Sequence, residues 1–213
     1  MTCRFQPYCE NDAATNMALD LALIDEAAVH QVPVMRAYGW LYPAFTCGIS
    51  QTRAEVLAAF PEAAAAEIVQ RPTGGGIVDH RHSLTYAIAV PPTLPLYREP
   101  APTLYRRLHG KLAEALQAQG FSVVLAPCTP CPPGGRRRQA ACFTTPEPDD
   151  VMLPNGIKVA GAALRRMREG LLIQGTIATC PLPGLDAIRL FADLAACPLL
   201  RTTQSNLPSR LTR

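Results

Sequence analysis

Apolar residues recur at helical spacing in two stretches of the chain, with polar residues between them. The first stretch follows Asn16, a residue type that caps helices. Asp20, Asp25 and Glu26 are expected on its outer faces. Its apolar face is expected to hold Met17, Leu21, Ile24 and Ala28. This pattern is typical of a surface helix that packs on a sheet.

The second stretch predicts the longest helix, from Pro100 to Gly120, where the glycine acts as a C-terminal stop. Its apolar side chains are Leu104, Leu108, Leu112 and Leu116. Two shorter helices are expected from Glu55 to Phe60 and from about Asp186 to Ala196.

Short runs of β-branched and apolar residues lie between the helices and predict strands. They cover residues 33–38, 45–49, 67–69, 84–90, 121–125, 157–163 and 171–179. Asn155-Gly156 is a strong hairpin signal, and Gly170 marks a second turn. The chain is therefore expected to be an α+β domain. Its sheet would be mixed and largely antiparallel, flanked by helices that cover it on one face.

Three consecutive glycines, Gly74, Gly75 and Gly76, lie between two predicted strands, after Arg71 and before His80. Glycine loses the most backbone freedom on folding, so such a run predicts a place where another group approaches the backbone closely. A dinucleotide fingerprint or a P-loop would open a helix, whereas this segment joins strand to strand. A hairpin loop with incidental charges is the alternative.

The composition is that of a globular protein, with 48% hydrophobic and 17% charged residues among 213. The length suits one domain over residues 1–213, without a separate accessory domain. A net charge of +3 does not indicate a nucleic-acid partner. No stretch is apolar enough to span a membrane, and the N-terminus lacks the apolar core of a signal peptide. We therefore expect a cytoplasmic protein whose eight cysteines are reduced thiols, most of them buried.

A Pro/Gly/Arg-rich loop is predicted at about residues 127–148, and loops of this length are usually functional or disordered. Cys128 and Cys131 within it have the spacing of metal ligands. A structural zinc site needs four ligands, however, so a pair of loop thiols is favoured and no metal is expected.

Five segments, in order, resemble the biotin/lipoate protein ligase and octanoyltransferase superfamily. The second of them looks like the family's first hairpin. The segments are Asn16-Met17-Ala18-Leu19-Asp20; Arg36-Ala37-Tyr38-Gly39-Trp40 with Pro43-Ala44 and Gly48-Ile49-Ser50-Gln51; Arg71-Pro72-Thr73-Gly74-Gly75-Gly76 with His80 and Leu84-Thr85-Tyr86; Asn155-Gly156-Ile157-Lys158-Val159-Ala160-Gly161-Ala162-Ala163; and Gly170-Leu171-Leu172-Ile173-Gln174-Gly175-Thr176-Ile177. The resemblance implies a mixed sheet with helices packed against it, in agreement with the pattern above.

The resemblance also implies attachment of an octanoyl or lipoyl group to a lysine of a lipoyl-carrier domain, such as glycine cleavage H protein or the E2 subunit of a 2-oxoacid dehydrogenase. Transferases of this family take the acyl group from acyl carrier protein through a cysteine thioester and need no cofactor. Ligases form an acyl-adenylate with ATP and Mg²⁺. A carrier-binding paralogue without chemistry is a third reading.

Cys142 and Lys158 are the residues that separate these routes. Octanoyltransferases of the lipoate-ligase-like type resemble this chain in having a nucleophilic cysteine before a phenylalanine, as in Cys142-Phe143. A nearby cation would favour the thiolate, and Lys158 is the candidate, which would also hold the acyl carbonyl oxygen. The alternatives are a buried, inert Cys142 and a solvated hairpin lysine.

The remaining candidates are expected to bind substrate. They are Arg71, Thr73, Gly74, Gly75, Gly76, His80, Gly161 and Ala162. The glycines would let the acyl chain and thioester approach the backbone. A hydrogen-bonded structural role is the alternative for His80.

The chain departs from the family pattern after the lysine. Gly161-Ala162-Ala163-Leu164 replaces a common Gly-Ser-Ala-Gln, and Gln174-Gly175 replaces a common His-Gly. The lost hydroxyl and amide weigh against a standard ligase.

Overall fold

The computed structural model of the protein describes residues 3–127 and 146–200. The predicted loop at about 127–148 lies almost entirely outside this part of the chain, and so do Cys128, Cys131 and Cys142. The helices and strands are β1 (Arg4–Asn11), α1 (Ala13–His30), β2 (Val34–Trp40), β3 (Ala44–Cys47), α2 (Arg53–Ala59), β4 (Glu67–Gln70), β5 (Val78–Asp79), β6 (Ser83–Val90), α3 (Pro95–Arg98), α4 (Ala101–Gln117), β7 (Val124–Leu125), β8 (Val151–Met152), β9 (Lys158–Met167), β10 (Gly170–Ala178) and α5 (Ala187–Ala195).

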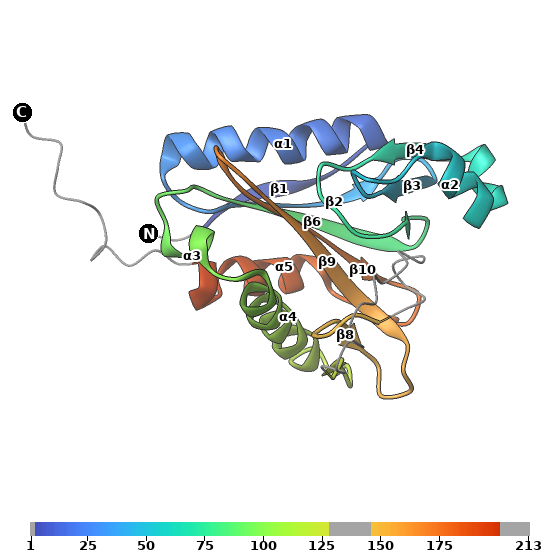
Figure 1. Ribbon diagram of the computed structural model, residues 1–213. Helices are drawn as coiled ribbons and strands as arrows, with labels where there is room; N and C mark the ends of the chain where they lie inside the picture. Colours follow the sequence, from blue (N-terminus) through green and yellow to red (C-terminus); the bar gives the residue numbers. More distant parts are fainter. Residues whose placement is uncertain (1–2, 128–145, 201–213) are drawn as a thin grey trace, which may run out of the picture.

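A seven-stranded sheet forms the centre of the molecule, in the order β1-β2-β6-β10-β9-β8-β7 (Figure 1). Its neighbouring strands are antiparallel except for the parallel pair β1–β2. A three-stranded sheet, β4-β3-β5, lies with α2 at one end of the large sheet (Figure 1). The predicted α+β class with a mixed, largely antiparallel sheet is confirmed.

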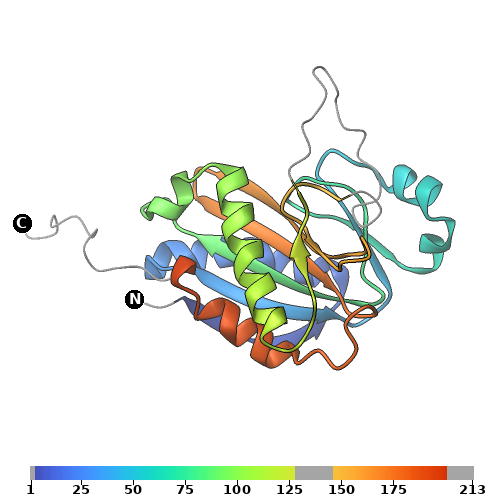
Figure 2. The ribbon, with the colours of Figure 1, turned by 90° about the horizontal axis from the view of Figure 1, so that it is seen from below.

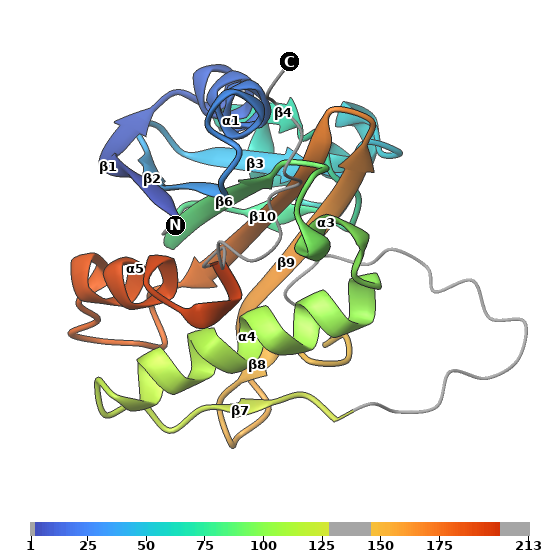
Figure 3. The ribbon, with the colours of Figure 1, turned by 90° about the vertical axis from the view of Figure 1, so that its left-hand side faces the viewer.

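Helices cover both faces of the large sheet, so the prediction that they cover only one is wrong. Ala87 and Ala89 of β6 pack with α1 on one face. Tyr86 and Ile88 pack on the other face with α4 and α5. Figures 2 and 3 show α1 on one side of the sheet and α4 and α5 on the opposite side. The near-continuous apolar run of β6 is the sequence signal of a strand buried on both faces.

The first helix begins earlier than its pattern indicated. Asp12, not Asn16, is the N-cap, and its side chain accepts a hydrogen bond from the backbone N–H of Thr15. Asn16 and Asp20 are fully buried, whereas Leu21, expected on the apolar face, is 43% exposed. The face of α1 that packs on the sheet is thus partly polar. The prediction of this face from the spacing of apolar residues was therefore wrong for Leu21 and Asp20.

A buried ion pair accounts for this polar face. The Arg36 guanidinium, in the middle of β2, lies 2.8 Å from a carboxylate oxygen of Asp20. It also donates to the backbone and side-chain oxygens of Asn16, and the Tyr38 hydroxyl donates to Asp20. Burial raises the pKa of the Asp20 carboxyl, and Arg36 opposes this shift. Buried charges are retained only when they are paired in this way.

Two further strand predictions need correction. The segments expected to form a first hairpin are β2 and β3, which lie in different sheets and do not pair. The edge strand β1 was not predicted, and it pairs in parallel with β2. By contrast, the β8–β9 turn at Asn155-Gly156 and the β9–β10 turn before Gly170 are confirmed as antiparallel connections.

The described residues include five cysteines, all of them free thiols as expected. Only Cys47 and Cys197 are buried, so the expectation that most are buried is wrong for this part of the chain. No helix of the described residues is both long and apolar enough to cross a membrane.

Candidate functional site

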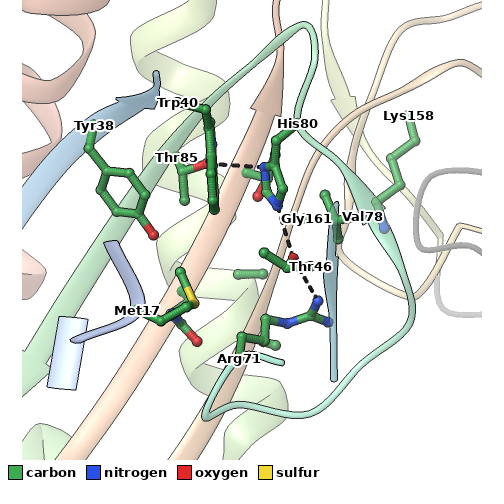
Figure 4. A pocket seen from close by; sticks show the side chains of 14 residues that line it. Met17, Tyr38, Trp40, Thr46, Arg71, Val78, His80, Thr85, Lys158 and Gly161 are labelled. Carbon is green, nitrogen blue, oxygen red and sulfur yellow. Dashed lines mark hydrogen bonds between the residues drawn. The ribbon is translucent and has the colours of Figure 1, made fainter. Parts of the chain in front are cut away.

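A narrow cavity lies where the two sheets meet, and it collects side chains from both (Figure 4). The space open to a water-sized sphere is about 30 Å³, which is room for one or two water molecules. An acyl chain would therefore enter only if lining side chains move. The lining residues are Met17, Tyr38, Trp40, Thr46, Arg71, Val78, His80, Thr85, Lys158, Gly161, Ala162, Ala163, Gln174 and Thr176.

The structure brings together five of the residues expected from the sequence. Arg71, His80, Lys158, Gly161 and Ala162 all line the cavity.

The other expected residues do not line it. Thr73 and the three glycines, Gly74 to Gly76, lie outside the lining. Cys142 lies outside the described residues.

Lys158 is not a solvated hairpin lysine, because its side chain is only 2% exposed. Its ammonium nitrogen lies 2.7 Å from a carboxylate oxygen of Asp150, whose side chain is 6% exposed. The ammonium also packs on the backbone of Gly161, where an added Cβ would lie 2.8 Å from Nζ. The absence of a side chain at Gly161 thus makes room for a cation at the cavity wall.

Arg71 connects the glycine segment, residues 71–76, to the three-stranded sheet. Its guanidinium donates to the carbonyl oxygens of Gly74 (2.7 Å) and Gly76 (2.8 Å) and to the hydroxyl of Thr46 (3.1 Å). With a residue exposure of 6%, it is buried in the loop that it organises. These contacts make Arg71 a scaffold for the glycine segment as well as part of the cavity wall.

The two neighbouring glycines differ in what they require. Gly75 has φ +90°, and a Cβ there would lie 2.8 Å from Nη2 of Arg71, whereas a Cβ on Gly74 would meet nothing within 4 Å. We expect Gly75→Ala to lower the free energy of unfolding by about 1–2 kcal/mol, the cost of a left-handed conformation for an L-residue, and to displace Arg71. Gly74→Ala should be close to neutral. Urea denaturation of both variants checks this, and equal effects would contradict it.

The glycine segment also reaches α1 through a buried chain of hydrogen bonds that the sequence did not reveal. The Thr73 hydroxyl donates to the side-chain carbonyl of Gln174 at 2.7 Å. The Gln174 amide donates to Asp20 at 2.6 Å. Gln174, a departure from the family pattern, therefore acts as both acceptor and donor between the loop and the helix.

His80 closes the cavity on the side of β6. Its Nε2 lies 2.9 Å from the Thr46 hydroxyl and its Nδ1 lies 3.1 Å from the Ser83 hydroxyl. The ring stacks on Trp40 with centroids 4.0 Å apart. Burial, and then the nearby Arg71 charge, hold the pKa of His80 well below 6.5. Its imidazole is therefore neutral at physiological pH. Its hydrogen bonds agree with the alternative reading of His80 as a structural histidine.

Acid sensitivity follows from the neutral His80. Between its depressed folded-state pKa and the ordinary value of 6.5, the unfolded chain binds a proton that the folded chain does not. The contribution of His80 to stability is therefore fully present above pH 6.5 and falls as the pH decreases, by up to about 1.36 kcal/mol per pH unit. Urea denaturation at pH 7 and pH 5.5 should show this loss, and His80→Asn should reduce it. Equal losses in both proteins would contradict the argument. His109, whose pKa is also lowered by burial, contributes in the same direction in both.

The sequence matches the family model described as the lipoyl protein ligase A/B catalytic domain over residues 12–185. The chain belongs to this family. The match spans most of the described fold and every lining residue of the cavity.

Proteins named octanoyltransferase LipM are among its curated relatives. The protein from Carboxydothermus hydrogenoformans is 33% identical over 181 residues, which cover 83% of this chain and 64% of the relative. The protein from Halalkalibacterium halodurans is 32% identical over 181 residues, with 83% and 65% covered. The matched region is thus slightly less than two thirds of these relatives' length.

Solved structures of ligases share the fold. Lipoate-protein ligase A bound with ATP superposes with a TM-score of 0.62 at 17% identity, covering 91% of this chain and 83% of that one. A bi-partite lipoate protein ligase from Thermoplasma acidophilum, described with its E2 lipoyl domain, gives 0.54 at 21% identity, covering 84% and 62%. The expected family fold is thereby confirmed.

Proposed function

We propose that this protein transfers an octanoyl group from acyl carrier protein to a lysine of a lipoyl-carrier domain, with a thioester on Cys142 as the intermediate. The observation that carries the proposal is the buried ammonium of Lys158 in the cavity wall, paired with Asp150. A fixed cation in a site shielded from water stabilises negative charge that develops on an acyl carbonyl oxygen. The similarity to proteins named octanoyltransferase supports the choice of acyl group.

In the first step, the Cys142 thiolate attacks the carbonyl carbon of the carrier thioester. A new carbon–sulfur bond forms to Cys142, the bond to the carrier sulfur breaks, and the released carrier thiolate takes up a proton. Lys158 would hold the carbonyl oxygen while it carries negative charge. The octanoyl group arrives already activated, so this step needs no nucleotide.

In the second step, the amine of the acceptor lysine attacks the acyl-enzyme. A carbon–nitrogen bond forms, the bond to Cys142 breaks, and the nitrogen loses a proton to give the amide, while the leaving Cys142 sulfur takes up a proton. The acceptor is proposed to be a lipoyl domain of the glycine cleavage H protein or E2 type. The ligase of the same fold that is described with its E2 lipoyl domain supports this choice.

The acyl chain is proposed to extend from Lys158 across the cavity toward Met17, which lies on the opposite side (Figure 4). Ala162 and Ala163, which have small apolar side chains, also line the cavity. Met17 is unbranched, so its side chain adapts readily to a chain entering the narrow space. The proposed roles of His80 and Arg71 are to shape the wall rather than to react.

The proposal is tested by supplying two kinds of donor to the purified chain with a lipoyl domain as acceptor. Octanoyl-acyl carrier protein without nucleotide should octanoylate the domain, and free lipoate or octanoate with ATP and Mg²⁺ should not modify it. Attachment only in the presence of ATP would favour the ligase alternative. An absence of product with either donor would favour the carrier-binding paralogue.

A further inference from the structure

Asp150 lies immediately before β8, after the sequence Glu147-Pro148-Asp149, and is 4% exposed. Its Oδ2 accepts from the Lys158 ammonium at 2.7 Å and from the backbone N–H of Glu147 at 2.6 Å. Its own N–H donates to the carbonyl of Glu147 at 3.1 Å. The carboxylate is therefore held by its own turn while it contacts Lys158.

Helix α4 and the strand connection at Ala126 fix this turn from outside. Asp149 adopts the left-handed region with φ +66°. His109 of α4 donates from Nδ1 to the Asp149 carbonyl at 2.7 Å, and Arg106 lies 3.1 Å from the Asp149 carboxylate. Ala126 exchanges backbone hydrogen bonds with Asp149 (3.0 Å) and Asp150 (2.7 Å). The Asp149–Asp150 turn is thus tied to its surroundings by at least four contacts.

Gly161 packs against both the Lys158 ammonium and the Asp150 carboxylate. A Cβ at this position would lie 2.7 Å from Cε of Lys158 and 3.0 Å from Oδ1 of Asp150. The ammonium and the carboxylate therefore both pack directly over one residue of β9 that lines the cavity.

The charges explain why such an arrangement is useful. A lysine has a flexible four-carbon stem, so its ammonium has no fixed position of its own. A buried ammonium without a counter-charge is strongly destabilised and favours its neutral form. An anion fixed by the backbone addresses both difficulties, because it compensates the charge and defines where the ammonium lies.

We infer that Asp150 is a positioning residue, which holds the Lys158 ammonium at the cavity wall for octanoyl transfer. The inference rests on the proposed function. Asp150 acts through Lys158 and does not itself touch the substrate. The His109 contact with the Asp149 carbonyl helps to hold the turn that carries Asp150.

A double-mutant cycle tests this role. The variants are Asp150→Asn, Lys158→Met and the combination, and the kcat and KM for octanoyl transfer from octanoyl-acyl carrier protein are measured for each. Asp150→Asn should lower kcat by roughly 100-fold with a much smaller change in KM. In the Lys158→Met background the same substitution should cause no further loss, because the residue that Asp150 positions is already absent.

Two other variants guard against a loss of folding. Asp193→Asn is the matched control, since Asp193 lies on α5, is 48% exposed and faces Arg189 at the surface, and it should keep most of the wild-type rate. Asp150→Glu keeps a buried anion but moves it by one methylene, so it should remain folded by circular dichroism with a lowered kcat.

The outcomes separate the two claims. An active wild-type chain whose Asp150→Asn and Lys158→Met losses multiply in the double variant would overturn the positioning role alone. So would a wild-type rate in folded Asp150→Glu and Asp150→Asn. A wild-type chain inactive with octanoyl-acyl carrier protein would remove the proposed function, and this inference with it.

Discussion

Replacing Lys158 by methionine is expected to lower the rate of octanoyl transfer by roughly 10²–10³-fold, the usual effect of removing one preorganised donor to a developing oxyanion. Methionine keeps the length and apolar stem of lysine and removes only the charge and its hydrogen bonds. The loss should appear mainly in kcat, because the proposed interaction is strongest when the carbonyl oxygen carries negative charge. Steady-state rates with octanoyl-acyl carrier protein and a lipoyl domain measure it.

Lys111→Met is the matched control for this substitution. Lys111 lies on α4, is 38% exposed and pairs only at the surface with Glu114, so its replacement should leave the rate near that of the wild type. If Lys158→Met kept a near-normal rate while remaining folded, Lys158 would have no role in the chemistry.

Cys142→Ser is expected to abolish turnover with octanoyl-acyl carrier protein. A serine hydroxyl is a weak nucleophile at neutral pH unless a base activates it, whereas a thiol near a cation ionises readily. Cys180→Ser provides the control, because Cys180 is an exposed free thiol and plays no part in the proposed reaction. Acyl transfer assays on both variants decide the matter, and a wild-type rate in Cys142→Ser would exclude a thioester at this residue.

Local patterns in the sequence predicted much of the fold. Asn155-Gly156 and Gly170 marked the two turns around β9, and the leucine repeat of α4 marked a helix that the structure places from Ala101 to Gln117. These features depend on residues close together in the chain. The mixed sheet and the α+β class followed from counting such elements.

Features that depend on distant partners could not be predicted in the same way. Thr73 and Gln174 are 101 residues apart and meet in one hydrogen bond. Asp20 has the appearance of a surface acid until Arg36, on a buried strand, is seen to pair with it. Only the three-dimensional packing brings these polar groups together. A periodic apolar pattern predicts which side chains are buried among apolar ones, but it does not show which buried polar side chains pair.

The residues of the candidate site also fall into those predicted from a local motif and those found only from their contacts. Lys158, Gly161 and Ala162 were expected from a short motif, and the structure brings them to one cavity. The glycine triplet was expected in the cavity wall, whereas Arg71 from the same segment lies there. Asp150 carried no motif of its own, and its importance emerges from its contact with Lys158.

The most direct test of the thioester mechanism is a mass measurement on the wild-type chain. After incubation with octanoyl-acyl carrier protein and no acceptor, the intact protein should gain the mass of one octanoyl group. The adduct should map to the peptide that contains Cys142, be released by hydroxylamine, and disappear when a lipoyl domain is added. An adduct on Cys180 or another cysteine would contradict the assignment of Cys142. The absence of any adduct, together with ATP-dependent lipoate attachment by Cys142→Ser, would contradict acyl transfer through a thioester altogether.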